Sequence, residues 1–147
     1  MNTGREDCAR IYDLWHQYAR DGEACKLLDL YADDATVETP LAMAILGKPD
    51  GVVRGRAELR QLIEEGLRRG PEGLVRCYRT GIFFTNGRAV TWEYPRQTPG
   101  GDQVDVVEVM DVRQKKIRHH RVYCGWLGFR LLTQAAKPAP REMAAAN

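Results

Sequence analysis

The carboxylate of Glu108 occupies a position in the sequence where a charge is costly. It lies in the run VDVVEVMDV, and the alternation of a β-strand places it on the same face as Val106 and Met110. A carboxylate among apolar neighbours must pair with another group, take up a proton, or face a cavity that holds water or a ligand. Glu108 is therefore the first candidate for acid/base chemistry.

The next run, IRHHRVYCGW, supplies an imidazole for this carboxyl group. Alternation puts His119 and His120 on opposite faces, so the turn between the two strands decides which residue meets Glu108. A three-residue turn places Glu108 opposite Val122 and makes His120 its diagonal neighbour. A four-residue turn places Glu108 opposite Arg121, which predicts an ordinary cross-strand ion pair. The sequence leaves both alternatives open.

Charge and hydropathy give no sign of nucleic-acid or membrane binding. The 147 residues carry 22 basic and 20 acidic side chains, for a net charge of +2. No apolar run is long enough to cross a bilayer, and the first ten residues lack the apolar core of a signal peptide. We expect one cytoplasmic domain over residues 1–135, followed by a flexible tail over 136–147.

The four cysteines are too scattered for a disulfide framework or a structural zinc site; they are Cys8, Cys25, Cys77 and Cys124. We expect reduced thiols, with Cys124 acting as a small apolar side chain on the strand of His120 rather than as a nucleophile. No metal and no cofactor is predicted.

Helices and one short strand are expected in the first half of the chain. Apolar spacing over residues 8–19 predicts an amphipathic first helix. A shorter helix over 24–33 contains Tyr31, and a strand over 35–37 closes at Pro40, which cannot donate a ladder hydrogen bond.

The connection over residues 41–54 is unusually apolar for a loop. It predicts either a lid over a cavity or a short helix packed on the core. A third helix then opens at Gly55, ends at Gly70-Pro71, and buries a stripe formed by Leu59, Leu62, Ile63, Gly66 and Leu67.

Four long strands fill the second half of the chain. Residues 74–84 and 88–94 flank Asn86-Gly87, a strong hairpin signal, and residues 103–126 form the hairpin that carries Glu108. Helices segregated from an antiparallel sheet predict an α+β domain with its helices on one face of the sheet.

The segments LYADDATVETP, RGRAELRQLIEEGL and VDVVEVMDV resemble the nuclear transport factor 2-like superfamily, in its ketosteroid isomerase and SnoaL-like branch. The resemblance covers residues 12–126. It implies a curved antiparallel sheet wrapped by the N-terminal helices into a cone, the cystatin-like α+β barrel, with a deep apolar pocket. It also implies a homodimer formed through the outer face of the sheet. Isomerases, cyclases, dehydratases, epoxide hydrolases and binding proteins share this fold, so the fold does not fix the function.

At the positions that match the site of ketosteroid isomerase, the chain has the same or a similar residue at some and a different residue at others. The general-base aspartate of that enzyme falls at Thr39, its oxyanion-hole tyrosine at Trp15 and a supporting tyrosine at Ile63. Another tyrosine is matched by Tyr31, and the oxyanion-hole aspartic acid by Glu108. The chain should therefore not isomerise steroids by that mechanism.

The limonene-epoxide hydrolase pattern also fails, because its arginine and one of its aspartates fall at Val106 and Val122. The register of the family places Glu108 and His120 on the concave face. Tyr78, Trp92 and Tyr94 lie on strands that can line the same cavity, although core packing explains them equally well.

These features predict an acid/base isomerase, cyclase or dehydratase that acts on a hydrophobic, oxygenated metabolite. Glu108 is expected to be the acid or oxyanion donor and His120 the proton acceptor. Alternatives are a non-catalytic ligand-binding or accessory protein of the same fold, and an interaction module that uses only the dimer face. The wall of the pocket is expected from Trp15, Tyr31, Thr39, Ile63, Val106, Met110, Val122 and Cys124.

Overall fold

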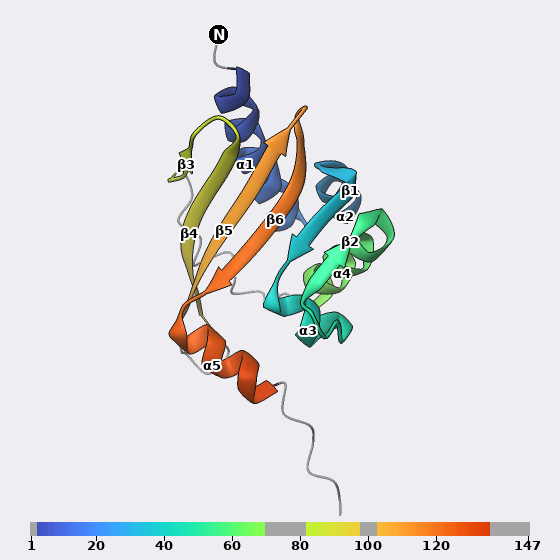
Figure 1. The fold of residues 1–147 in the computed structure, drawn as a ribbon, viewed down its shortest axis with the longest axis vertical. Coiled ribbons are helices and arrows are strands. Elements are labelled where there is room, and N and C mark those ends of the chain that lie inside the picture. The colour runs from blue at the N-terminus through green and yellow to red at the C-terminus, as the bar shows by residue number, and fades with distance from the viewer. Residues whose placement is uncertain (1–2, 70–81, 98–102, 136–147) are drawn as a thin grey trace, which may run out of the picture.

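The computed structural model describes residues 3–69, 82–97 and 103–135. It has a curved six-stranded sheet in the order β2-β1-β6-β5-β4-β3, together with five helices (Figure 1). In chain order the elements are α1 (Thr3–Asp21), α2 (Ala24–Asp29), β1 (Tyr31–Glu38), α3 (Pro40–Leu46), β2 (Val52–Arg54), α4 (Gly55–Arg69), β3 (Phe84–Thr85), β4 (Ala89–Gln97), β5 (Gln103–Arg113), β6 (Lys116–Cys124) and α5 (Trp126–Ala135).

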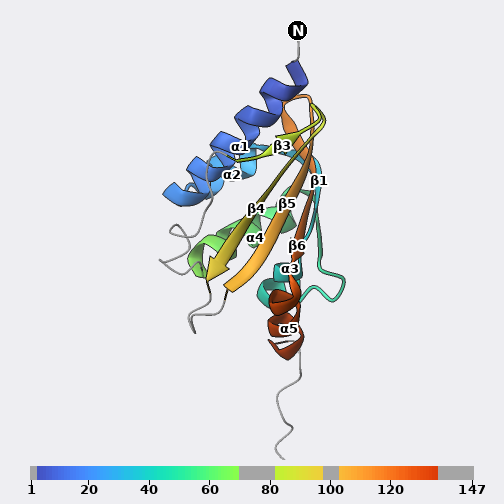
Figure 2. The same ribbon diagram turned by 90° about the vertical axis from the view of Figure 1, so that its left-hand side faces the viewer.

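Three helices cover one face of the sheet. Figure 2 shows α1, α2 and α4 together on one side, while no described helix lies over the opposite, outer face. α1 packs against β4 and β5, and α4 packs against β1 and α2. The most deeply buried side chains, which include Ile11, Leu28, Leu59 and Met110, fill the space between these layers. The predicted α+β class with a curved sheet is confirmed.

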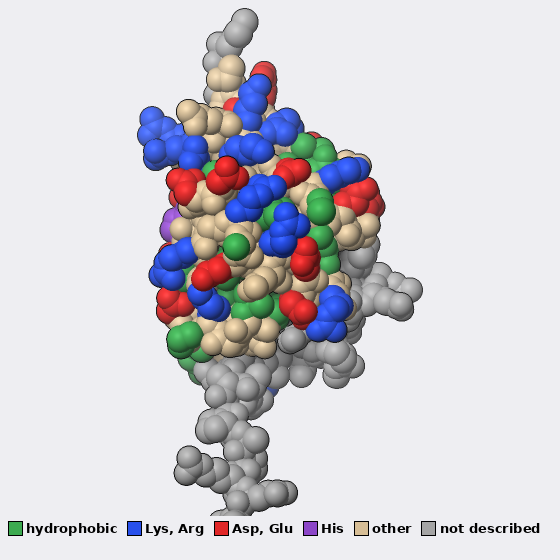
Figure 3. All heavy atoms as spheres, turned by 90° about the vertical axis from the view of Figure 1, so that its right-hand side faces the viewer, with side chains coloured by type: hydrophobic (Ala, Val, Ile, Leu, Met, Phe, Trp, Pro, Cys, Tyr) green, Lys and Arg blue, Asp and Glu red, His purple; other side chains and the backbone are tan. Residues whose placement is uncertain are grey.

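Acidic and basic side chains mix over the face formed by α2, β2 and α4 (Figure 3). Arg56 bonds to Asp29 at 2.5 Å, and Lys48 bonds to Glu58 at 2.8 Å. In the described part of that face, the charges therefore form no patch of a single sign that would attract a polyanion.

One pairing in the sheet is parallel. β1 runs parallel to β6, with Val37 beside His120, while every other neighbouring pair of strands is antiparallel. The N–H of Ile117 donates to the carbonyl of Leu30 at 2.9 Å, which ties the start of β1 to β6. The sequence predicted only antiparallel strands in this sheet.

The second helix is shorter than the sequence predicted, and Tyr31 lies in a strand. α2 ends at Asp29, and β1 begins at Tyr31. The backbone from residue 30 onward bonds to the neighbouring β6 rather than continuing the helix, since these long-range hydrogen bonds outweigh local helix propensity. Tyr31 is thereby fixed in the sheet, with its side chain buried.

Residues 41–54 form a short helix and a strand rather than a lid. Pro40 is the first residue of α3, and the hydroxyl of Thr39 caps this helix by accepting from the N–H of Leu41 at 3.2 Å. Gly47 ends α3 with a left-handed φ of 66°. Of the two alternatives, the short helix is the one found.

The turn between β5 and β6 differs from both predicted turns. Gln114 and Lys115 both have left-handed φ values, 51° and 62°, as a two-residue hairpin turn requires. The register then shifts by one residue, because Val112 pairs with Ile117 while Asp111 pairs with His119. This leaves residue 118 as an extra residue in β6, a β-bulge.

The turn and the bulge together produce the strand pairing that a three-residue turn predicted. Glu108 lies opposite Val122, and Met110 lies opposite His120. Arg121 lies on the outer face, so the ion pair between Glu108 and Arg121 is not formed.

The hairpin predicted at Asn86-Gly87 is confirmed, but within the described residues its first strand, β3, covers only Phe84–Thr85. The Asn86-Gly87 hairpin joins β3 to β4, and 126–135 form a helix, but residues 74–81, which include Cys77 and Tyr78, and the tail over 136–147 lie outside the described residues. Cys8, Cys25 and Cys124 are free thiols. Among the described residues, no helix is long and apolar enough to span a membrane, and no cluster of side chains could hold a metal ion.

Two helical glycines should respond in opposite ways to replacement by alanine. A Cβ on Gly4 would lie 2.2 Å from the carbonyl oxygen of Gly87, whereas a Cβ on Gly66 would have no neighbour within 4 Å. We expect Gly4→Ala to lower the free energy of unfolding by about 1–3 kcal/mol through overpacking. Gly66→Ala should raise it by up to about 1 kcal/mol, because alanine favours the helix. Urea denaturation measures both changes, and unchanged stability in Gly4→Ala would show that α1 does not pack against this turn as described.

Candidate functional site

Glu108 lies in the middle of β5 on the face covered by the helices, and the residue is only 4% exposed. Trp92 of β4 pairs with it on one side, and Val122 of β6 pairs with it on the other. The hydroxyl of Tyr94, two residues further along β4, donates to Oε1 of Glu108 at 2.7 Å. The carboxyl group is therefore buried but not isolated.

His120 holds the other oxygen of this carboxyl group. Its side chain is also buried, and its Nε2 lies in hydrogen-bond contact with Oε2 of Glu108. Its Nδ1 lies 2.9 Å from the hydroxyl oxygen of Tyr31. The pairing of Glu108 with His120 is the one that the family resemblance favoured.

The hydrogen bonds continue from Tyr31 to the first helix. The indole Nε1 of Trp15 donates to the Tyr31 hydroxyl at 3.0 Å. These contacts join one side chain from each of α1, β1, β6, β5 and β4 into a chain that we call the buried relay: Trp15, Tyr31, His120, Glu108 and Tyr94.

Counting donors assigns the protons in the buried relay. The indole of Trp15 can only donate, so the hydroxyl oxygen of Tyr31 accepts from it. We assign the Tyr31 O–H as the donor to Nδ1 of His120, because the described residues offer this O–H no other acceptor. In a neutral imidazole this leaves the proton on Nε2, which donates to the carboxylate of Glu108. Every donor is then used, and both oxygens of Glu108 accept.

Tyr31 stays neutral in this arrangement. Burial raises the pKa of Tyr31 well above its ordinary value, and the charge of Glu108 raises it further, while the hydrogen bond from Trp15 opposes the shift. Tyr31 therefore fixes the tautomer of His120 without giving up its own proton.

Aromatic side chains of the first helix cover the buried relay. The ring of Trp92 lies 5.1 Å from Tyr12, 5.5 Å from Trp15 and 4.9 Å from His16, measured between ring centroids. The Nδ1 of His16 donates to the carbonyl of Tyr12 at 2.8 Å. Burial lowers the pKa of His16, against the opposing effects of this carbonyl and of Glu108.

His16 is a site residue that the sequence analysis missed. It follows Tyr12 by one helical turn and adjoins Trp15, so the apolar face of the first helix already contained the signal.

The other predicted site residues fall into two groups. Val106 and Met110 are buried on either side of Glu108 along β5, and Val122 and Cys124 lie on the same face of β6. Ile63 is buried in α4, and the side-chain hydroxyl of Thr39 caps α3.

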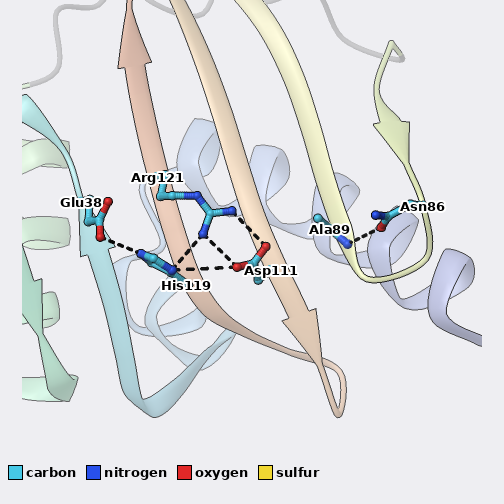
Figure 4. A network of polar contacts seen from close by, with 6 residues as sticks. All are labelled: Glu38, Asn86, Ala89, Asp111, His119 and Arg121. Atoms are coloured by element: carbon cyan, nitrogen blue, oxygen red, sulfur yellow. Dashed lines mark hydrogen bonds and ion pairs between the residues drawn. The ribbon is translucent and has the colours of Figure 1, made fainter.

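The outer face carries a separate polar network (Figure 4). Arg121 makes two hydrogen bonds to Asp111, at 2.8 and 3.0 Å, and also donates to Nδ1 of His119 at 2.8 Å. Nε2 of His119 lies 3.0 Å from Glu38. The guanidinium of Arg121 lowers the pKa of Asp111. This network links β1, β6 and β5 on the side of the sheet away from the buried relay.

A surface hollow of about 570 Å³ lies beside this outer network. The residues that line it are polar or charged, and Arg118 among them already bonds to Asp34 and Gln114. The hollow is distinct from the apolar surroundings of Glu108. It is lined by Asp111, Arg113, Gln114, Arg118 and His119.

Comparison with known families identifies the family to which the chain belongs. The family model for the SnoaL-like domain matches residues 9–120. The chain belongs to the SnoaL-like family. This confirms the resemblance to the nuclear transport factor 2-like superfamily. A comparison with curated proteins found no match.

Solved structures of SnoaL-like and related proteins share the fold. An NTF2-like protein of unknown function from Mesorhizobium loti is 19% identical, with a TM-score of 0.62, covering 82% of this chain and 92% of its own. An NTF2-like protein of unknown function from Burkholderia xenovorans is 21% identical, with a TM-score of 0.61 and coverages of 92% and 97%. The epoxide hydrolase/cyclase-like enzyme SalBIII, which acts in pyran ring formation in the polyether salinomycin, is 18% identical, with a TM-score of 0.58 and coverages of 86% and 96%.

Replacing Glu108 with glutamine should destabilise the protein. Glutamine places an amide N–H₂ against a donor, Tyr94 O–H or His120 Nε2–H, which leaves buried groups unpaired at a cost of about 1–3 kcal/mol. Glu93→Gln, at an exposed position on β4, is the matched control and should change stability by less than about 0.5 kcal/mol. The measurement is the free energy of unfolding in urea at neutral pH. Equal or higher stability of Glu108→Gln would show that the carboxyl group is protonated in the folded protein.

Proposed function

We propose that this SnoaL-like protein binds an apolar, oxygenated small molecule and performs acid/base chemistry on it with Glu108 and His120. The observation that carries the proposal is the buried carboxylate and imidazole pair, which is held by two tyrosines and covered by aromatic rings. Polar groups concentrated in an apolar interior are typical of active sites. The SalBIII enzyme supports the proposal, because it has a related fold and is described as epoxide hydrolase/cyclase-like.

In this proposal Glu108 is the base and His120 positions it. The carboxylate accepts a proton from the substrate, and the Nε2–H of His120 stays hydrogen-bonded to it throughout. Once Glu108 is neutral, the Tyr94 O–H loses its charged partner and becomes available to a developing negative charge on a substrate oxygen. Glu108 then returns the proton to another atom of the substrate, as an isomerisation, cyclisation or dehydration requires.

The roles of the pair are exchanged relative to those expected from the sequence. A proton held on Nε2 makes His120 the donor, because Tyr31 occupies Nδ1. Glu108 is left as the acceptor.

A binding protein without turnover is the second candidate. It is favoured by one observation: both oxygens of Glu108 and both ring nitrogens of His120 already have protein partners. A substrate must displace one of these hydrogen bonds before it reacts, whereas a bound ligand need not.

Deuterium exchange separates the two candidates. Enolisable aromatic ketones, beginning with 1-tetralone, are incubated with the protein in D₂O, and incorporation at the α-carbon is followed by mass spectrometry. We expect wild-type protein to accelerate exchange and Glu108→Gln to lose about 100-fold or more of that acceleration. His119→Gln, on the outer face of the same hairpin, should exchange like wild type. Binding without acceleration in wild type would favour the binding protein, and equal exchange by Glu108→Gln would remove Glu108 as the base.

We further propose that the protein is a homodimer joined through the outer face of the sheet. Val107 and Val109 lie on this face, and Tyr123 beside them is 54% exposed. No described helix lies over the outer face of the sheet (Figure 2). A monomer rarely leaves such an apolar area uncovered.

Sedimentation tests the dimer. Wild-type protein at micromolar concentration should sediment at twice the chain mass of 16.7 kDa. Val109→Asp should shift it to the monomer, because a dimer would bury the new charge. Val109→Thr, which changes shape little, should remain mostly dimeric. A single 16.7 kDa species in wild type would contradict the proposal.

A further inference from the structure

We propose that the indole N–H of Trp92 is a ligand-binding donor, and that the ligand presents to it the oxygen of an uncharged carbonyl group. This inference rests on the proposed function, since it names the class of molecule that the site around Glu108 receives.

The observation is a buried donor without an acceptor. Trp92 is 1% exposed, and its Nε1 finds no hydrogen-bond partner among the described residues. Buried N–H groups in folded proteins almost always have a partner, so an exception needs a reason. Binding sites are a common reason, because the ligand supplies the missing acceptor.

The two tryptophans of the site differ in whether the indole N–H has a hydrogen-bond partner. The rings of Trp15 and Trp92 lie 5.5 Å apart, and both adjoin the buried relay. The N–H of Trp15 is taken by Tyr31 at 3.0 Å. The indole N–H of Trp92 has no described partner, although Trp92 pairs directly with Glu108 across β4 and β5. The residue that carries the open donor is therefore the cross-strand neighbour of the proposed base.

The surroundings define the class of ligand. The rings of Tyr12, Trp15 and His16 around Trp92 favour a flat, largely apolar molecule. The nearby carboxylate of Glu108 repels an anionic acceptor such as a carboxylate or phosphate. A hydrogen bond from the Trp92 N–H would polarise the carbonyl group of the ligand. The C–H bond next to that carbonyl would then be more acidic, so the proposed base, Glu108, could remove its proton more easily.

The test compares a ketone with its hydrocarbon counterpart in two variants. Affinities of 1-tetralone and tetralin are measured by fluorescence titration of wild-type protein and of Trp92→Phe, which keeps an aromatic ring but removes the N–H. We expect wild type to bind the ketone about fivefold to tenfold more tightly than the hydrocarbon, and Trp92→Phe to lose this preference while binding tetralin unchanged. The Nε1–H resonance of Trp92 in a ¹H–¹⁵N spectrum should shift with the ketone and not with the hydrocarbon.

The other possible results separate a failure of the Trp92 inference from a failure of the proposed small-molecule site. If Trp92→Phe keeps the preference for the ketone, Trp92 is not the donor, and the proposed acid/base function stands apart from this result. If neither probe binds wild type, the small-molecule site itself is overturned, and this inference with it. Thermal melting of Trp92→Phe checks its folding. The variant should melt below wild type but in one cooperative transition, because the smaller ring leaves unfilled volume at a fully buried position.

Discussion

The hydrogen bond between the carboxylate of Glu108 and the imidazole of His120 is the interaction on which the described structure depends. Each group is 4% exposed, and either one alone in that interior would carry a desolvation cost of several kcal/mol. Tyr94 and Tyr31 complete the hydrogen bonds of the pair, and Trp15 completes those of Tyr31. Because five different elements each supply one member, the buried relay forms only when the helices and the sheet have come together.

One inserted residue in β6 decides which groups meet. With the two-residue turn at Gln114 and Lys115 and no bulge, the pairing would shift by one, and Glu108 would face Arg121. The bulge at residue 118 turns His120 inward and sends Arg121 outward to Asp111. The same local irregularity therefore builds both the buried relay and the outer network (Figure 4).

Much of the fold followed from patterns that depend on neighbouring residues alone. Helical spacing located α1 and α4, alternation located β5 and β6, and an apolar setting marked Glu108 as unusual. The sequence predicts a helix at Tyr31, because the strand found there exists only through long-range hydrogen bonds to β6. The bulge could not be read from composition, since Arg118 is unremarkable in a strand. Alternation places Tyr94 on a strand that can line the cavity, but its hydrogen bond to Glu108 depends on the register between β4 and β5.

The position of the proton on His120 tests this account most directly. A long-range ¹H–¹⁵N spectrum of the imidazole nitrogens at neutral pH distinguishes the tautomers of His120, with a His120→Phe sample to assign its signals. We predict a proton on Nε2, held toward Glu108, and a bare Nδ1 that accepts from Tyr31. A proton on Nδ1 with a bare Nε2 would contradict it, because Glu108 would then have to be the donor and could not serve as the base.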